Sequence, residues 1–326
     1  MSMHFLTLPG RLLAIGLCCL GLLDQTTAAT TAADPFDYHL KPQQVAEDTY
    51  VFIGKTEDFS RKNGGYIVNT GFIVTTAGVI VIDSGPSRRF AEQQRAAIAT
   101  VTDQPILRVY LTHHHPDHFL GDQVYADVPQ YALAATRAGI QTEGEMFSDN
   151  MYRMVGDWMR GTRVTLPDKS VKVGVEEVGG HRLEFFAMKG HTPGDLVIFD
   201  HTTGVLFSGD LVFNQRAATT PHATLDDWLQ SLQHLKELPF KVLVPGHGAV
   251  ATDQAPIVQT RDYLEWLAAT LQEGAESGMD MAEIMQSPIP ERFQTISLVR
   301  EELQRSVSHW FPALEDAVLK PVTAAE

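Results

Sequence analysis

The sequence predicts an α/β fold in which two β-sheets pack together and helices cover their outer faces. Strand-like runs and helical patterns follow one another in the order β-rich, α/β, β-rich and α/β, the order expected when helices flank two packed sheets. The length of 326 residues is sufficient for one large domain or two small ones with a substantial core. The composition, 44% hydrophobic and 20% charged, is that of a soluble globular protein.

The first half of the chain supplies the first sheet and its helices. Runs rich in β-branched and aromatic residues, punctuated by glycines, predict strands at 50–54, 66–76 and 79–83. Charged and Gln residues on one side, with Ala and Ile on the other, predict a helix at 87–100. A buried strand is expected at 106–112, a short helix at 119–126 and a further strand at 130–134.

The segment 144–161 is rich in Met and aromatic residues at near-helical spacing. Such a stripe usually packs into a core. The alternative is an apolar lid over an active site, because methionine surfaces adapt to ligands. Strands are then expected at 182–188, 196–200, 205–208 and 242–244, and helices at 225–238 and from 256 onward, with an interruption at 287–290.

The N-terminus has the pattern of a secretory signal. Arg11 precedes the apolar run LLAIGLCCLGLL at 12–23, and small residues follow, so cleavage after Ala28 or Ala33 is expected. The run is shorter than the roughly 20 residues that span a bilayer, so no membrane span is expected after cleavage. Cys18 and Cys19 are the only cysteines and lie in this run. The sequence therefore predicts a bacterial periplasmic or secreted protein without disulfides or Cys metal ligands.

The expected organisation is a cleaved signal peptide at 1–33, an irregular lead-in at 34–49, one domain with C-terminal helices at 50–312, and a tail at 313–326. The formal net charge is −15, without any run of Lys and Arg. An acidic surface repels polyanions. Nucleic acid is therefore not expected as a partner.

Five short segments place metal-binding residue types directly after predicted strands. In THHHPDH (112–118), His113 and His115 are two apart in extended chain and project to one side. Neutral imidazole is a good zinc ligand, a carboxylate can bridge two ions, and such a cluster would be unsatisfied without metal. Three His with a shared Asp could form one site, and an Asp, two His and the same shared Asp the other. The other four segments are GHTPGD (190–195), SGD (208–210), PGHG (245–248) and VIDSG (81–85).

This series of motifs, in this order, resembles that of the metallo-β-lactamase superfamily from about residue 50 to His247. The resemblance implies a four-layer αβ/βα sandwich that binds two Zn²⁺, with iron or manganese as alternatives. It also implies that Asp83 supports the ligands without binding metal itself. The metal ligands it implies are His113, His115 and His191 at one site, Asp117, His118 and His247 at the other, and Asp210 between them.

The aspartate at position 210 narrows the resemblance. True metallo-β-lactamases typically carry Cys or Ser there, whereas a bridging Asp is similar to glyoxalase II-like thioesterases and lactonases. Together with the export signal, NTGFIVT and TPHATLDDW resemble the quinoprotein relay system zinc metallohydrolases. These proteins accompany periplasmic quinoprotein dehydrogenases, so a link to such a system is expected.

The expected activity is hydrolysis of a small acyl substrate. A hydroxide stabilised by two cations would attack an ester, lactone, thioester or amide carbonyl, and Asp117 would orient it and carry a proton to the leaving group. Three residues of the loop after Asp210, namely Asn214, Arg216 and His222, are candidate substrate contacts, although Arg216 could equally form a structural ion pair.

Other functions remain open at this stage. One is a glyoxalase II-like thioesterase. Another is an oxidoreductase similar to persulfide dioxygenases, which would bind one iron through His113, His191 and Asp210. A third is a non-catalytic metallochaperone or binding module of an electron-transfer system.

Overall fold

The computed structural model describes residues 1–7, 10 and 35–318. The chain divides into two units, Met1–Pro35 and Phe36–Glu326, and all helices and strands of the described residues lie in the second. Most of the expected signal peptide, including Cys18 and Cys19, lies outside the described residues. Within the described part, no helix combines the length and apolarity needed to cross a bilayer.

Seven strands form the first sheet. They lie in sequence order across the sheet, antiparallel from β1 to β4 and parallel from β4 to β7. The parallel part matters for function, because the carboxyl ends of parallel strands meet at one edge. The strands are β1 (Gln43–Ala46), β2 (Thr49–Phe52), β3 (Thr70–Thr75), β4 (Gly78–Ile82), β5 (Ile106–Tyr110), β6 (Gln130–Ala132) and β7 (Lys169–Ser170).

Five strands form the second sheet, in the order β12-β11-β10-β9-β8. The pairs from β8 to β11 are antiparallel, whereas β11 and β12 are parallel. The carboxyl ends of β11 and β12 therefore also lie at the same edge of this sheet. The strands are β8 (Gly174–Val178), β9 (His181–Met188), β10 (Asp195–Asp200), β11 (Val205–Phe213) and β12 (Val242–His247).

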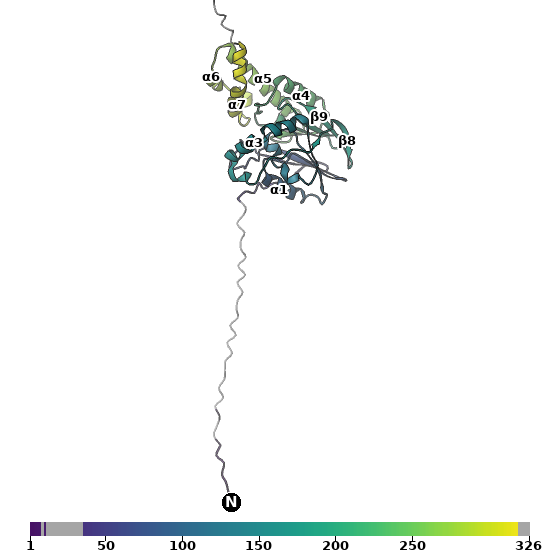
Figure 1. The fold of residues 1–326 in the computed structure, drawn as a ribbon, viewed down its shortest axis with the longest axis vertical. Coiled ribbons are helices and arrows are strands. Elements are labelled where there is room, and N and C mark those ends of the chain that lie inside the picture. Colours follow the sequence, from purple (N-terminus) through teal and green to yellow (C-terminus); the bar gives the residue numbers. More distant parts are fainter. Residues whose placement is uncertain (8–9, 11–34, 319–326) are drawn as a thin grey trace, which may run out of the picture. The chain divides into compact units, whose positions relative to one another are not determined.

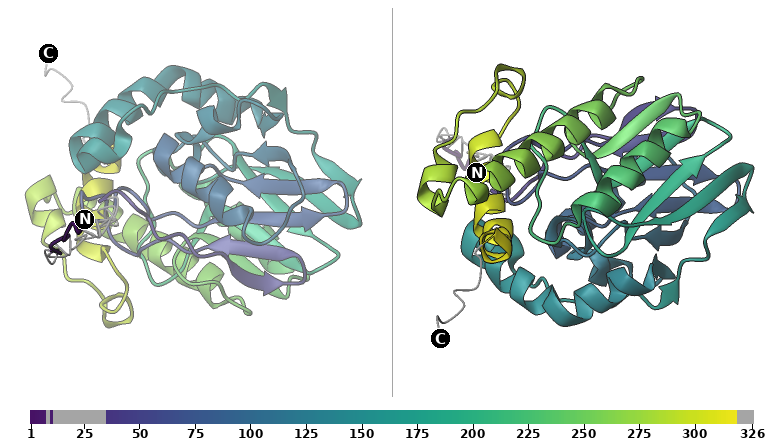
Figure 2. Two further views of the ribbon diagram at one scale, coloured as in Figure 1. Left: turned by 90° about the horizontal axis from the view of Figure 1, so that it is seen from below. Right: turned by 90° about the horizontal axis from the view of Figure 1, so that it is seen from above.

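Helices cover the outer face of each sheet. Helices α1 and α3 lie on the side of the first sheet, and α4 and α5 on the side of the second (Figure 1). The views from below and above show these two helical layers in turn (Figure 2). The helices are α1 (Arg88–Ile98), α2 (Pro116–Phe119), α3 (Ala134–Val155), α4 (Leu225–Glu237), α5 (Ala255–Glu276), α6 (Met281–Met285) and α7 (Val299–Val318), with 3₁₀ turns at Asp122–Tyr125, Gly156–Met159 and Glu291–Phe293.

The hydrophobic core consists of three clusters, one between the two sheets and one between each sheet and its helices. In β3, Phe72 faces the helices on the outer side and Ile73 faces the second sheet. In β10, Ile198 meets the first sheet and Phe199 meets the helices on the other side. Successive residues of a strand point to opposite faces, so each central strand serves two apolar layers. The predicted four-layer α/β fold is confirmed.

Two expected boundaries are wrong. The segment 34–49 is not wholly irregular, because β1 pairs antiparallel with β2. This strand lies at a sheet edge and is half exposed, so it has no hydrophobic alternation to mark it. The expected tail from 313 starts inside α7, which continues to Val318 although Pro312 lies within it.

Candidate metal centre

The candidate ligands gather at the carboxyl ends of the parallel strands. Asp83 follows β4, and the THHHPDH segment follows β5 and leads into α2. Pro116 at the start of α2 suits a first helical turn, where its missing N–H has no partner to lose. In the second sheet, Asp210 lies in β11, His247 ends β12, and His191 lies between β9 and β10.

Three imidazoles and one carboxylate form the first group of ligand atoms. One atom from each of His113, His115, His191 and Asp210 lies within 4.8 Å of the others, and all four residues are buried. His191 Nε2 lies 2.7 Å from His115 Nδ1 and 3.3 Å from Asp210 Oδ2. These side chains come from three separate segments but converge on one point.

The second group adjoins the first through Asp210. It consists of Asp117, His118 and His247, whose ligand atoms also lie within 4.8 Å of one another. Asp210 Oδ1 lies 3.2 Å from His118 Nε2, and its Oδ2 lies 3.1 Å from His247 Nε2. Asp210 is therefore the residue shared by the two groups.

Several of the candidate ligand atoms are buried without a protein hydrogen-bond partner, which fits bound cations. Unpartnered buried atoms include His113 Nε2, His118 Nε2, Asp117 Oδ2 and Asp210 Oδ1. Leaving polar atoms buried and unpaired is unfavourable by about 1–3 kcal/mol each. A metal ion at each group would satisfy them with nitrogen and oxygen ligands of the kinds zinc prefers.

The protonation states also suit metal binding. Burial, with repulsion from neighbouring imidazoles, holds the pKa of His113 and His115 well below its ordinary value, and burial lowers that of His191 to about 3. Neutral imidazoles are the form that binds metal. His118 differs: burial lowers its pKa, but the carboxylates of Asp210 and its neighbours outweigh burial and raise it well above normal. A positive charge is therefore favoured between those carboxylates.

Asp83 holds the ligands from behind. Its carboxylate accepts hydrogen bonds from Thr112 N and Thr112 Oγ1, both at 2.8 Å, and lies 2.7 Å from His118 Nδ1. A ligand histidine usually donates its second ring N–H to such a partner, which fixes the ring orientation. In the same way, the second ring nitrogen of His247, Nδ1, lies within hydrogen-bond distance of the Ile67 carbonyl, at 2.9 Å. Asp83 has a φ of 61°, a left-handed conformation uncommon outside glycine.

His115 has a partner that the sequence did not indicate. Its Nε2 lies 2.8 Å from His222 Nδ1, and His222 Nε2 lies 3.5 Å from Glu143 of α3. Glu143 also contacts His114 Nε2, at 3.1 Å. His222 therefore touches a metal ligand, and Glu143 joins the metal centre to α3. Glu143 belongs to no motif, so no local pattern pointed to it.

The other two candidate substrate contacts lie differently. Arg216 is buried and forms an ion pair with Glu302 of α7 at 3.4 Å, the structural alternative that its sequence left open. Asn214 donates through Nδ2 to the Ala249 carbonyl, at 2.7 Å. Arg216 and His222 line the cavity described next, whereas Asn214 is not among its lining residues.

A cavity of about 490 Å³ opens above the metal centre. Its floor contains four of the candidate ligands, namely His115, Asp117, Asp210 and His247. Side chains from α3 and α7 form two of its walls. A volume of this size is ordinary for a small-molecule site.

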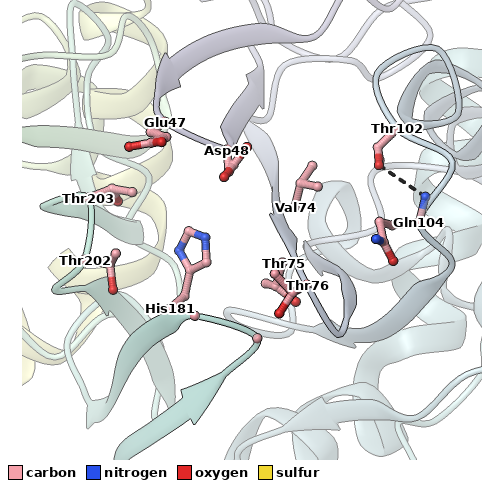
Figure 3. A pocket seen from close by; sticks show the side chains of 12 residues that line it. Glu47, Asp48, Val74, Thr75, Thr76, Thr102, Gln104, His181, Thr202 and Thr203 are labelled. Carbon is pink, nitrogen blue, oxygen red and sulfur yellow. Dashed lines mark hydrogen bonds between the residues drawn. The ribbon is translucent and has the colours of Figure 1, made fainter.

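A second pocket lies at the other end of the sheets, away from the metal centre. Its volume is about 460 Å³, and the turns before β4 and between β8 and β9 line it. His181 lies there among acidic and threonine side chains (Figure 3). None of the pocket's residues belongs to a group of possible metal ligands in the described chain. Within the described residues, the groups of possible metal ligands instead lie at or beside the cavity above Asp210.

Comparisons with known proteins agree with this geometry. The family profile described as the metallo-beta-lactamase superfamily matches residues 63–247, which is more than half of the chain. A metallo-beta-lactamase structure from Pontibacter korlensis has a TM-score of 0.56 and 23% identity, covering 69% of this chain and 99% of that one. At this identity the likeness shows the fold alone.

Curated relatives are hydrolases of several kinds. A probable metallo-hydrolase of Bacillus subtilis is 22% identical over 58% of this chain and 70% of its own length. A hydroxyacylglutathione hydrolase of Bdellovibrio bacteriovorus is 25% identical over 63% of this chain and 65% of its own. An atrochrysone carboxyl ACP thioesterase of Aspergillus fumigatus is 27% identical over 59% of this chain and 54% of its own length. The chain thus spans between about half and just over two thirds of these relatives. The profile match, the fold and the converging His and Asp ligands together identify the chain as a metal-binding hydrolase of the metallo-β-lactamase superfamily.

Proposed function

We propose that the protein is a dinuclear zinc hydrolase that cleaves an ester, lactone, thioester or amide bond of a small acyl substrate. The observation that carries this proposal is the position of Asp210. Its two carboxylate oxygens face His118 and His247 of one ligand group and His191 of the other. A shared carboxylate is the arrangement expected for two neighbouring ions.

The ligand set divides between the two ions. His113, His115 and His191 would hold one, Asp117, His118 and His247 the other, and Asp210 both. Bound there, the cations would polarise a carbonyl oxygen and lower the pKa of a bound water to about 7.

Asp117 is the candidate proton carrier. Its Oδ2 is buried without a protein hydrogen-bond partner, and the residue lines the cavity. Burial raises its pKa above the ordinary value, which favours accepting a proton during the reaction. The carboxylate can orient the attacking water, accept a proton from it and deliver that proton to the leaving group.

The test is metal analysis combined with a substrate panel of nitrocefin, lactones, thioesters and simple esters. We expect two zinc ions per chain, turnover of at least one acyl substrate, and loss of turnover after chelation. Asp117→Asn is expected to lower kcat by a factor of about 10²–10⁴. The control is Asp149→Asn, which changes an exposed aspartate of α3 and should leave kcat unchanged.

Full activity in Asp117→Asn or after metal removal would reject this mechanism. One iron per chain without hydrolysis would instead favour the mononuclear oxidoreductase alternative. Two bound metals without turnover of any substrate would favour a binding role.

Export and a role beside a periplasmic quinoprotein dehydrogenase belong to the same proposal. The apolar run at 12–23 and the small residues after it support export, and the resemblance of 69–75 and 220–228 supports the link. N-terminal sequencing of protein from the periplasmic fraction tests the first: a retained Met1 would contradict it. Deletion of the gene tests the second, because growth on the dehydrogenase's substrate should then fail.

A further inference from the structure

The cavity above the metal centre is walled mainly by apolar side chains. Met146 and Met154 of α3 stand at its walls and are 51% and 39% exposed. Large apolar side chains left open to water around a concave site are usually covered by a ligand. Besides Pro116, which lies among the candidate ligands, the apolar lining residues are Phe59, Ile67, Met146, Phe147, Met154 and Pro221.

The cavity lining contains two arginines, and acidic residues offset the charge of both. Arg216 is 2% exposed and pairs with Glu302 at 3.4 Å. Arg305 pairs with the same carboxylate at 3.0 Å and with Asp58 at 3.2 Å. Two positive charges therefore face two negative ones. Neither arginine of the described lining is therefore free to receive an anionic group, and the other basic side chains there, outside the candidate ligands, are His222 and His309.

We infer that the cavity selects substrates whose acyl side is an uncharged alkyl or aryl group; this inference rests on the hydrolytic function proposed above. Transfer of an alkyl chain from water into the apolar cavity should strengthen binding about fourfold per methylene. A carboxylate at the far end of the chain would lose its hydration without gaining a partner. The site therefore favours apolar acyl groups and discriminates against acyl groups with a terminal anion.

The experiment measures binding separately from catalysis. Straight-chain hydroxamates bind zinc through their head group, so the alkyl tail samples the cavity. Calorimetry on the zinc-loaded protein would measure the Kd of acetohydroxamate, butanohydroxamate, hexanohydroxamate and octanohydroxamate. A fifth compound, octanohydroxamate with a carboxylate at the far end of its chain, would test the effect of a terminal charge. We expect Kd to fall about fourfold per methylene until the cavity is filled. The terminal carboxylate should weaken octanohydroxamate binding at least tenfold.

Two methionines provide matched variants. Met146→Ala removes part of the cavity wall, whereas Met281→Ala removes a similarly exposed methionine, 43% exposed, on α6. The ratio of the acetohydroxamate to the octanohydroxamate Kd should fall several-fold in Met146→Ala and stay unchanged in Met281→Ala. Equal affinity along the series, or tighter binding of the carboxylated compound, would overturn the inference.

A parallel series of 4-nitrophenyl esters separates this inference from the proposed function. If tail length governs hydroxamate binding but no ester is cleaved, the inference about the cavity holds and the hydrolytic proposal fails. If esters are cleaved with kcat/KM independent of chain length, hydrolysis holds and the cavity inference fails.

Discussion

Gly246 shows how closely single residues are packed around the metal centre. A Cβ atom at this position would overlap Asp210 Oδ1 and press on the Gly209 backbone. Asp210 is the carboxylate shared by both groups of candidate ligands, so any displacement of it would disturb both groups. Gly246→Ala is therefore expected to lower the zinc content by at least one ion per chain, and activity with it.

Metal analysis of purified Gly246→Ala checks this prediction. Gly180→Ala serves as the control, because a Cβ there meets nothing within 4 Å although its φ of 95° makes any side chain strained. If both variants retain two zinc ions, the close packing of Gly246 against Asp210 has no functional role.

The link from His115 through His222 to Glu143 gives a second prediction at this scale. A group that orients a ligand histidine typically contributes 10–100-fold to metal affinity. Glu143→Gln weakens the acceptor for His222, and we expect the zinc affinity of the first site to fall about tenfold. Competition with a chromogenic chelator measures it. Glu145→Gln, an exposed glutamate on the same helix, should have no effect.

Sequence reasoning found the candidate ligands because they lie in dense local motifs. THHHPDH alone supplies four of the seven. Asp83 was found in the same way, through VIDSG, but the other residues that position the site have no such signal. His222 meets His115 across 107 positions of sequence, and Glu302 meets Arg216 across 86. Contacts of this kind depend on how sheets and helices pack, which no local pattern specifies.

At the scale of whole elements, α3 packs into the core, as the sequence predicted, and also lines the cavity; whether it acts as a lid stays a prediction. Met151 and Val155 are buried against the first sheet's core. Met146 and Met154, on the same helix, line the cavity instead. One face of the helix therefore packs into the core and another forms the wall of the candidate active site. A single hydrophobic stripe could not distinguish them, because both faces are apolar.

The sequence predicted the central strands well and the edge strands poorly. β4 and β10 are buried on both faces and appear as continuous apolar runs. β8 was not predicted, because its GVEEV sequence is mostly exposed at the edge of the second sheet. The length of β11 was also underestimated, since SGD interrupts its apolar run although the strand continues to Phe213.

The turn that holds His181 gives a prediction for pH dependence. His181 Nδ1 lies 2.8 Å from Asp200 Oδ2. This hydrogen bond, with a contribution from Asp48, raises the pKa of His181. Burial raises the pKa of Asp200, but hydrogen bonds from His181 and Thr203 outweigh it and lower that pKa.

The stabilisation from the pair has a definite pH window. The histidine contribution is complete below its unfolded pKa of about 6.5 and is lost as pH rises through the raised folded value. The aspartate contribution is present above about pH 3.9 and is lost as pH falls. The difference in unfolding free energy between wild type and His181→Gln should therefore fall by about 1 kcal/mol from pH 5.5 to pH 9.

Denaturant unfolding at the two pH values measures this difference. His234→Gln, which replaces an exposed histidine of α4, is the control and should show no comparable change. A difference for His181→Gln that stays constant with pH would contradict the assignment of the charged pair.

At the scale of the whole molecule, the C-terminal helix is part of the candidate active site. Arg305 and His309 of α7 line the cavity, and Ala217 N donates to the Ser297 carbonyl at 2.9 Å just before that helix. The sequence predicted helices from residue 256 onward, but it did not predict where they lie. These helices contain no functional motif, and their hydrophobic pattern does not show that α7 contacts the loop after β11. The buried pair of Arg216 and Glu302 fixes that contact.

Removal of one partner from this pair gives the last prediction. Glu302 is fully buried and also accepts hydrogen bonds from Thr219 and Arg305. Glu302→Gln would leave the Arg216 charge buried without a counter-charge, which should lower the free energy of unfolding by about 3–5 kcal/mol. Glu301→Gln, the exposed neighbour, is the control. The double variant Arg216→Met/Glu302→Leu removes both charges, and it should recover much of the loss, because replacing a buried ion pair by apolar groups is often neutral. If Glu302→Gln were as stable as Glu301→Gln, α7 would be held to the cavity by its apolar face alone.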